Sequence, residues 1–312
     1  MNIGIVGYGK LGQAVERRCA DFPDIALSCI VSRRADALTS KSGVPVIAPE
    51  KALGGSLDID CMIIAVGSER DATDTVLAFL ERFNTVDCFD MHRHGIKHRK
   101  IAGNGAKNGN HVALCMSGWD PGLLSVVRLY LSSFIPCAEC TTFWGEGVSQ
   151  GHTNALRSIS GVIDAVQYTV PIPEATSAAL RGEKYCGASH KRICLVACGE
   201  GEEKRIEDEI RKSEYFEGSP TDVRFVSENE LSLHNKPYHK GEVIAAERGM
   251  GESGSRAVFT LEMASNPDFT ASILLASARA VHRLYKEGKR GAFTLFDIPP
   301  SYFYPSDPYS ML

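Results

Sequence analysis

The sequence lacks any apolar run that approaches the roughly 20 residues of a membrane-spanning helix. Its first residues, MNIGIVGYGK, also lack a basic segment followed by a long apolar one, which predicts that no secretion signal is present. An excess of positive charge is missing too, since the formal net charge of the 312 residues is -4. We therefore expect a cytoplasmic protein with no general attraction to nucleic acid or to anionic membranes, in which phosphate binds only at a local site.

Cysteine is present at 10 positions, but its spacing is not typical of a metal centre or a disulfide scaffold. Cys137 and Cys140 lie close together without a second suitable pair, and a zinc site needs about four ligands. We therefore expect Cys137 and Cys140 to be small buried residues with reduced thiols at the start of a strand, and we expect no bound metal. His92, His94 and His98 are surrounded by Arg and Lys, so we expect a solvated basic loop and helix start there.

Short β-rich runs alternate with amphipathic helical stretches over the first 120 residues, which predicts a parallel sheet with helical crossovers. After residue 120 the pattern favours antiparallel sheet with helices to one side, a second lobe of α+β type. VSQGH is expected to be a loop in this lobe. A long helix follows that begins at Asp268 or Thr270 and ends at Gly288, and its apolar face is expected to pack on the first domain.

The segment GIVGYGKLG has the G-x-G-x-x-G spacing between an expected strand and an expected helix. The first glycine permits a tight turn, the second lets the backbone approach a pyrophosphate, and the third lets helix and strand pack closely. The helix that follows points free N–H groups at the anion. The fold class is therefore α/β, an N-terminal Rossmann-type doubly wound sheet. The residues expected to contact the dinucleotide here are Gly7, Tyr8, Gly9, Lys10, Leu11 and Gly12.

An acidic residue is missing from the end of the second strand, where many NAD enzymes bind the ribose hydroxyls. Ser32, Arg33 and Arg34 stand there instead, and a hydroxyl with two guanidinium groups is suited to hold a 2′-phosphate by charge-assisted hydrogen bonds. The alternative is a solvated basic pair on a surface turn. These charges predict NADP(H) rather than NAD(H). Gly67 and Ser68, after another parallel strand, are expected near the point where the dinucleotide crosses the sheet.

Two carboxylates, Asp90 and Asp120, follow the fifth and sixth expected strands. They therefore fall at the carboxyl edge of the sheet, where open α/β sheets bind ligands. Carboxylates at that edge are suited to bind an ammonium group and to accept a proton. A solvated strand end for Asp90 and a turn or helix cap for Asp120 are the alternatives, and the residues alone leave both open.

The segments GYGKLG, SRR, FDMHRH, SGWDPG, TFWGEGVSQGH, AVQYT, HKR and NPDFTAS make the chain resemble the meso-diaminopimelate D-dehydrogenases, in the same order. SGWDPG and TFWG-x-G-x-SQGH are more specific than the glycine loop. The resemblance implies an NADP-dependent homodimer of lysine biosynthesis. An enzyme of this family is expected to deaminate the D-centre of meso-2,6-diaminopimelate reversibly. The products are ammonia and L-2-amino-6-oxopimelate, which cyclises to tetrahydrodipicolinate. The resemblance also implies a dinucleotide-binding domain over 1-120, completed by 267-312, and a substrate-binding and dimerisation lobe over 121-266.

The resemblance also implies roles for individual residues. Asp90 and Asp120 are expected to be catalytic. Further cofactor contacts are expected from Met91, His92, Pro121 and Gly122. The expected substrate-binding residues are Trp119, Trp144, Gln150, Gly151, Thr169, Arg192, His239 and Asn266. The stretch HNKPYHKGEV aligns loosely, so His239 is preferred to His234 for this contact.

Two alternatives to this function stay open at the level of sequence. One is a broader D-amino-acid dehydrogenase of the same architecture, because Met91 and the extra histidines beside it depart from the family pattern. The other is a non-enzymatic protein that senses NADP. The carboxylate pair at the sheet edge and the carboxylate-binding residues of the second lobe disfavour the sensor.

Overall fold

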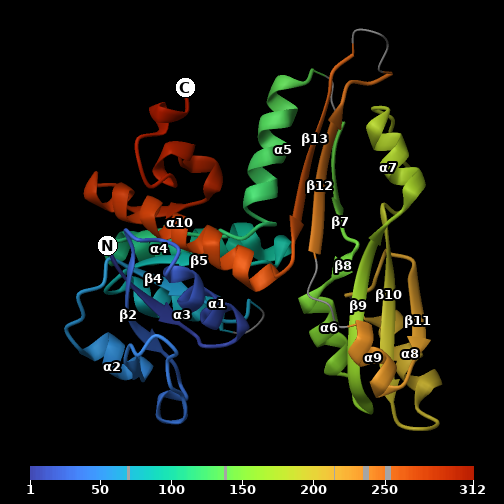
Figure 1. Cartoon of the computed structure of the whole chain (residues 1–312), viewed down its shortest axis with the longest axis horizontal. Helices are drawn as coiled ribbons and strands as arrows, with labels where there is room; N and C mark the ends of the chain where they lie inside the picture. Colours follow the sequence, from blue (N-terminus) through green and yellow to red (C-terminus); the bar gives the residue numbers. More distant parts are fainter. Residues whose placement is uncertain (69–70, 137–138, 214, 235–238, 250–253) are drawn as a thin grey trace. The chain divides into compact units, whose positions relative to one another are not determined.

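A computed structural model gives the fold, and it describes residues 1–312 except 69–70, 137–138, 214, 235–238 and 250–253. The chain divides into two compact units (Figure 1). The first is formed by Met1–Val126 together with Pro267–Leu312, and the second by Val127–Asn266. Among the described residues, no helix combines the length and the apolar composition that crossing a membrane requires.

The first unit is built on a parallel sheet of seven strands among the described residues, in the order β14-β6-β5-β4-β1-β2-β3. Six of them follow the strand order typical of dinucleotide-binding folds, so the predicted doubly wound sheet is confirmed. Ile3, Ile5 and Ile63 are fully buried at its centre, as strands covered on both faces require. The strands are β1 (Asn2–Val6), β2 (Ala26–Val31), β3 (Val46–Ile47), β4 (Cys61–Ile64), β5 (Asn84–Asp87), β6 (Val112–Leu114) and β14 (Gly291–Phe293).

Helices cover both faces of this sheet. On one face, Val15 of α1 and Leu274 of α10 pack in the same core as β1. On the other, Val76 of α3 and Ala102 of α4 pack against Met62 of β4. The α-helices are α1 (Lys10–Cys19), α2 (Pro49–Gly54), α3 (Ala72–Leu80), α4 (Gly95–Asn108) and α10 (Asn266–Lys286). Short 3-10 helices are η1 (Ala35–Ala37), η2 (His92–His94), η3 (Leu295–Asp297), η4 (Pro300–Tyr302) and η5 (Pro308–Met311).

The second unit contains two sheets, where the sequence pattern predicted one antiparallel sheet. One has the order β13-β12-β7 and is antiparallel; the other has the order β11-β10-β9-β8, with β10 and β11 parallel. Its strands are β7 (Glu139–Trp144), β8 (Gly147–Val148), β9 (Val162–Pro171), β10 (His190–Cys198), β11 (Thr221–Phe225), β12 (His239–Ala246) and β13 (Arg256–Met263). Its helices are α5 (Leu123–Phe134, which begins in the first unit), α6 (Gln150–Arg157), α7 (Pro173–Leu180), α8 (Glu203–Lys212) and α9 (Glu228–His234).

Two local predictions were wrong. The VSQGH stretch was expected to be a loop, but Gln150 begins helix α6, because Leu156 further along the same segment packs into the core beside β9 and β10. The long helix begins at Asn266, before the expected Asp268 or Thr270. The charged surface helix α8 is anchored by a narrow apolar stripe, since Ile206 and Ile210 are fully buried.

Candidate active site

The glycine-rich loop between β1 and α1 has the backbone geometry of an anion site. Gly7 has φ +96°, and a Cβ on Gly12 would lie 2.0 Å from the carbonyl oxygen of Gly7. A Cβ on Gly9, by contrast, would meet nothing within 4 Å. Gly9 is the N-cap of α1 and no side-chain hydrogen bond caps the helix, so the N–H groups of its first turn have no side-chain cap. The loop therefore fits a dinucleotide pyrophosphate.

Tyr8 of this loop is held by a buried carboxylate. Its hydroxyl donates to Glu16 on α1, whose other oxygen accepts hydrogen bonds from Ser40 Oγ at 2.7 Å and from the amide of Ser42 at 2.8 Å. Burial by itself raises the pKa of Glu16, but these donors outweigh it and lower the pKa from 4.5 to about 2. Of the first two residues of α1, Lys10 is exposed and Leu11 packs partly against the core.

We expect Glu16→Gln to lower the free energy of unfolding at neutral pH and to flatten its pH dependence. Because the folded pKa of about 2 lies below 4.5, the stabilisation is complete above about pH 5 and is lost as the pH falls toward 2. That shift corresponds to at most about 3 kcal/mol. Urea unfolding from pH 7 down to about pH 3 measures it, with the exposed Glu50→Gln as control. The same pH dependence in wild type and Glu16→Gln would contradict this assignment.

The residues after β2 present positive charge to solvent. Arg33 and Arg34 are both exposed, and the Arg33 guanidinium forms an ion pair with Asp71 at 2.9 Å. Ser32 lies directly at the strand end, and its Oγ accepts a hydrogen bond from the amide of Arg34 at 3.2 Å. The hydroxyl and the two guanidinium groups are thus adjacent and accessible at the end of β2.

The loops after β4 and β5 meet at the carboxyl edge of the sheet. A Cβ on Gly67 would have nothing within 4 Å, and Ser68 Oγ accepts a hydrogen bond from the amide of Asp90 at 3.2 Å. The carboxylate-bearing residue Asp90 lies three residues beyond β5 and is exposed, while Met91 is half-buried and His92 begins η2 on the surface. Asp90 therefore lies at the carboxyl edge of the sheet, as predicted, and its amide contacts the loop after β4 through Ser68.

Asp120 lies in the turn that connects β6 to α5. Ser125 Oγ donates to Asp120 Oδ1 at 3.5 Å, and Trp119 and Asp120 are both partly exposed. Gly122 has φ +138°, and a Cβ there would lie 2.0 Å from the carbonyl oxygen of Gly118, so the turn, which also contains the half-buried Pro121, closes tightly. The tight turn fixes the backbone on both sides of the Asp120 carboxylate.

In the second unit, Arg192 and Thr169 are register partners on β10 and β9. The Nε of Arg192 and the Oε1 of the fully buried Gln167 have no hydrogen-bond partner within the described part of the chain. Gln167 Nε2 donates to Thr169 Oγ1 at 3.3 Å. Buried polar atoms that lack a protein partner are costly, so this cluster is suited to bind a polar ligand group such as a carboxylate.

Two histidines that the sequence analysis did not single out border Arg192. Burial and the charge of Arg192 lower the pKa values of His152 and His190 to about 4, so both rings are neutral at neutral pH. His190 Nε2 accepts a hydrogen bond from the amide of Trp144 at 2.8 Å, and the two rings lie 5.0 Å apart. His190 thereby fixes Trp144 at the end of β7. The only sequence signal was the position of each histidine inside a motif, SQGH and HKR.

The other predicted substrate-binding residues of the second unit lie on other elements, or their side chains lie outside the described residues. His239 is buried at the start of β12, opposite Met263, and Asn266 follows three residues after Met263. Gly151 is exposed in the first turn of α6. The side chains of Gln150 and His234 lie outside the described residues, as does Cys137. Cys140 carries a free thiol on β7, and burial raises its pKa.

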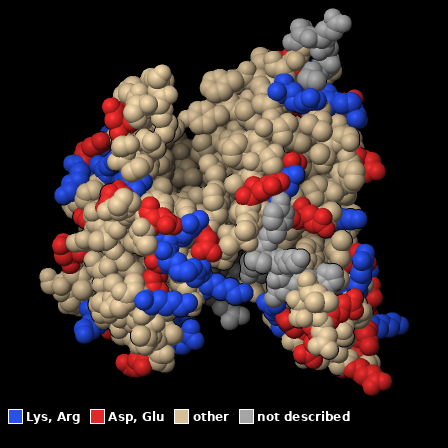
Figure 2. Space-filling model, in the orientation of Figure 1, with Lys and Arg blue, Asp and Glu red and all other residues tan. Residues whose placement is uncertain are grey.

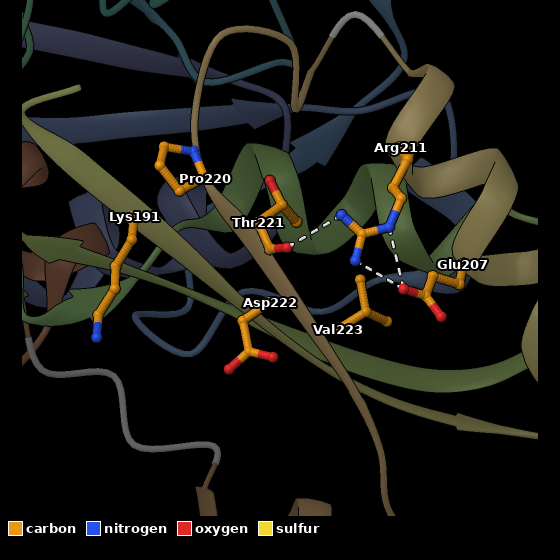
Figure 3. A pocket seen from close by; sticks show the side chains of 7 residues that line it. All are labelled: Lys191, Glu207, Arg211, Pro220, Thr221, Asp222 and Val223. Carbon is orange, nitrogen blue, oxygen red and sulfur yellow. Dashed lines mark hydrogen bonds and ion pairs between the residues drawn. The ribbon is translucent and has the colours of Figure 1, made fainter. Parts of the chain in front are cut away.

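A shallow pocket in the second unit is separate from this cluster. It is lined by Lys191, Glu207, Arg211, Pro220, Thr221, Asp222 and Val223 (Figure 3). Its arginine, Arg211, is bound to Glu207 at 2.7 Å and donates to the carbonyl of Thr221. Arg211 is therefore already paired, and the exposed Lys191 is the other cation that lines this pocket.

The expectation that His98 is solvated with its neighbours was wrong. His92, His94 and the nearby basic side chains are exposed, but His98 is buried and its Nε2 lies 3.0 Å from Asp87 Oδ2. The reason is that His98 lies on the buried face of α4, which packs against the sheet. The carboxylate partner is 11 residues away in sequence and was therefore not visible from the local pattern.

Comparison with known proteins agrees with the resemblance over nearly the whole chain. The family described as diaminopimelic acid dehydrogenase C-terminal domain matches residues 118–265. The meso-diaminopimelate D-dehydrogenase of Ureibacillus thermosphaericus is 39% identical, covering 99% of this chain and 97% of that protein. That of Corynebacterium glutamicum is 38% identical, covering 96% and 94%.

Solved structures agree as well. The C. glutamicum DAP dehydrogenase in complex with DAP aligns with a TM-score of 0.93 and 36% identity, covering 100% of this chain and 98% of that one. An engineered D-amino acid dehydrogenase bound to NADP+ aligns with a TM-score of 0.90 and 36% identity, with the same coverage. The chain belongs to the meso-diaminopimelate D-dehydrogenase family.

Proposed function

We infer that this protein oxidatively and reversibly deaminates the D-centre of meso-2,6-diaminopimelate with NADP+, a reaction of lysine biosynthesis. The observation that carries the inference is the similarity to curated meso-diaminopimelate D-dehydrogenases over 96–99% of the chain. The products are ammonia and L-2-amino-6-oxopimelate, which cyclises to tetrahydrodipicolinate.

The residues present fit NADP(H). The open space beside Gly9 and the uncapped start of α1 suit the pyrophosphate, and Ser32, Arg33 and Arg34 suit the 2′-phosphate. Gly67, Ser68, Met91, His92, Pro121 and Gly122 are proposed as further contacts. When bound, the oxidised nicotinamide supplies the two-electron oxidant of the reaction.

Asp90 and Asp120 are proposed to bind the reacting ammonium group and to accept a proton as the C=N bond of the imine forms. Both carboxylates are accessible, and both lie on loops at the carboxyl edge of the sheet. Ionised carboxylates favour the ammonium group through charge-assisted hydrogen bonds. Water then attacks the imine carbon, and loss of ammonia leaves the carbonyl group.

Arg192 and Thr169 are proposed to bind the carboxylate at the other end of the substrate. The unpartnered Arg192 Nε and its burial favour a bound anion, because a buried guanidinium gains most from a paired carboxylate. Trp119 and Trp144 are proposed to contact the substrate's aliphatic chain. Polar contacts are proposed for Gln150, Gly151, His239 and Asn266.

A steady-state assay tests the function. Purified protein with NADP+ is given meso-diaminopimelate, D-alanine or D-lysine, and reduction of the nicotinamide is followed by absorbance. We expect turnover with meso-diaminopimelate at a kcat/KM at least about a hundredfold above the two other D-amino acids, because D-lysine lacks the distal carboxylate and D-alanine lacks both the distal carboxylate and the distal ammonium group. Similar kcat/KM values for all three would instead support the broader D-amino-acid dehydrogenase, whose architecture the engineered relative shares. No turnover with any of them would overturn the assignment.

A homodimer in the cytoplasm is also proposed. Leu129, Tyr130 and Phe134 of α5 and Val258 of β13 are exposed in the second unit, and Figure 2 shows an area of few charges over these elements. An exposed apolar patch of this kind is typical of a subunit interface. The mass of the protein in solution, measured by light scattering, distinguishes the dimer from a monomer.

A further inference from the structure

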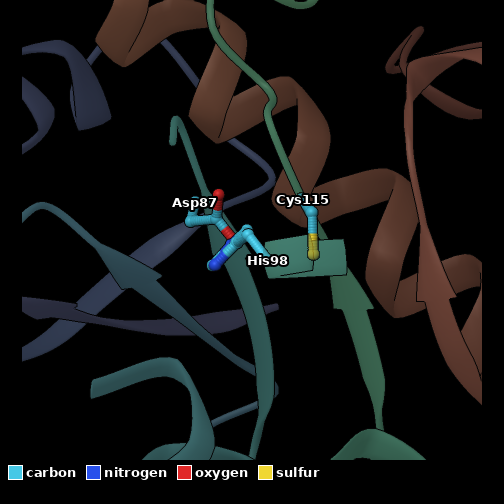
Figure 4. A group of neighbouring side chains, drawn as sticks. All are labelled: Asp87, His98 and Cys115. Atoms are coloured by element: carbon cyan, nitrogen blue, oxygen red, sulfur yellow. The ribbon is translucent and has the colours of Figure 1, made fainter. Parts of the chain in front are cut away.

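Three buried side chains of the first unit, Asp87, His98 and Cys115, place their donor atoms within 4.8 Å of one another (Figure 4). The combination of carboxylate, imidazole and thiol resembles a metal site. However, Asp87 Oδ2 already accepts a hydrogen bond from His98 Nε2 at 3.0 Å, since an ionised carboxylate only accepts. Burial, with the nearby charge of Asp87, holds the pKa of Cys115 well above its usual range, so without a metal ion the thiol stays protonated beside the Asp87 carboxylate. The cluster is better described as a group of hydrogen-bonded side chains centred on the Asp87 carboxylate, which we call the node.

The carboxylate of Asp87 connects two loops of the sheet edge. Its Oδ1 accepts hydrogen bonds from the amide of Phe89 at 2.9 Å and from the amide of Met116 at 3.0 Å. The first amide belongs to the loop that carries Asp90, and the second to the loop that carries Asp120. The carbonyl oxygen of Asp87 also accepts from the amide of Ser117 at 2.7 Å. A single side chain thus fixes the backbone of both loops, directly before Asp90 and four residues before Asp120.

Met116 shows why this support is needed. Its φ is +58°, in the left-handed region that side chains other than glycine rarely adopt. Such a conformation persists only where the surroundings hold it, and here the hydrogen bond from its own amide to Asp87 does so. Loss of that bond therefore removes a support of this conformation in the turn that leads to Asp120.

His98 supports the same node from α4. Its Nδ1 bonds Thr73 Oγ1 at 2.9 Å, and its ring stacks on Phe89 with centroids 4.2 Å apart and an interplanar angle of 5°. Phe89 directly precedes Asp90. The imidazole therefore holds the Asp87 carboxylate on one side and the neighbour of Asp90 on the other.

We propose that Asp87 and His98 are positioning residues for the dehydrogenase reaction, which hold the two loops bearing Asp90 and Asp120 in the arrangement that the chemistry needs. This rests on the function proposed above. Both side chains are almost completely buried, so they act through the loops and do not touch the substrate. Reacting groups misplaced by about 1 Å can cost about a hundredfold in rate, so a modest shift of either loop has a large kinetic effect.

The test compares Asp87→Ala, Asp87→Asn and His98→Phe with wild type. Asp87→Ala removes the hydrogen bonds that the carboxylate accepts from Phe89, Met116 and His98. We expect kcat to fall about tenfold to a hundredfold while the Kd for NADP+ changes less than about twofold, since the glycine loop is untouched. Asp87→Asn keeps an acceptor for both amides, so it should recover most of kcat. His98→Phe retains the stacking on Phe89 and is expected to lose an intermediate fraction of kcat.

Asn84→Ala is the matched control. Asn84 is buried at the opposite end of β5, where it also ties two segments by accepting from the amide of Val112 and donating to the carbonyl of Asp60. Its loss should lower Tm as Asp87→Ala does but leave kcat unchanged. Equal kcat in Asp87→Ala and wild type, or equal kcat losses in Asn84→Ala and Asp87→Ala, would overturn the positioning role. If Asp87→Ala does not fold, the positioning role is tested with Thr73→Val and His98→Phe. Unchanged kcat in both of these variants would overturn that role. An inactive wild type would instead contradict the proposed function.

Discussion

Replacing Asp120 with asparagine is expected to lower kcat/KM for meso-diaminopimelate by at least about tenfold. The substitution keeps the size of the side chain but removes its negative charge and its capacity to accept a proton. The ammonium group then loses a charge-assisted hydrogen bond, which is stronger than a neutral one, and formation of the imine loses its proton acceptor. Because both steps involve the reacting amino group, we expect kcat to fall together with kcat/KM, in a steady-state assay with saturating NADP+.

The structure makes Asp120→Asn a specific test. Asp120 is only partly buried, and the turn that holds it is closed by the backbone at Gly118 and Gly122, so the substitution should change the free energy of unfolding little. Asp74→Asn, an exposed acidic residue in the first turn of α3, serves as control and should retain wild-type kcat/KM. Near-normal activity of Asp120→Asn would refute a role for this carboxylate in the chemistry.

The parallel sheet was predictable because its signals are local. The strands β1, β2 and β4 are short apolar runs that lead into a glycine or a serine, and the helices α1 and α3 that follow β1 and β4 carry apolar residues at a helical period. The conformations of Gly7 and Gly12 could likewise be expected from their spacing alone, because one motif determines both. The strand β14 was not predictable in the same way: its three residues, Gly291–Phe293, pair with β6 far away in sequence.

The parts of the site that the sequence did not reveal depend on contacts between distant residues. His98 lies in a run of basic residues, and only the packing of α4 against the sheet turns its ring toward Asp87. Glu16 precedes two arginines in the sequence of α1, yet it is buried against Tyr8 and the loop at Ser40. Charge patterns predict exposure on average, whereas burial of a single charged group is decided by the partners that the fold brings to it.

Replacing both Arg33 and Arg34 with alanine is expected to lower kcat/KM for NADP+ by about a hundredfold and to leave that for NAD+ nearly unchanged. Each hydrogen bond between a charged side chain and a phosphate contributes about 1.5–3 kcal/mol, and NAD+ lacks the phosphate that these side chains are proposed to bind. The Arg33 side chain is 79% exposed and its ion pair with Asp71 lies at the surface, where such pairs contribute little to stability. The double variant should therefore keep the wild-type Tm.

Two further variants test whether the expected loss of kcat/KM for NADP+ is due to the 2′-phosphate. Arg17→Ala removes another exposed, ion-paired arginine, the partner of Asp268, and should leave the ratio of kcat/KM for NADP+ to that for NAD+ unchanged. Asp71→Asn removes the carboxylate that competes with a phosphate for Arg33, so it should raise the affinity for NADP+ or leave it as it is. Comparable kcat/KM with the two cofactors in the wild type, or a ratio unaffected by the double alanine variant, would mean that Arg33 and Arg34 are a solvated basic pair and that the 2′-phosphate is bound elsewhere.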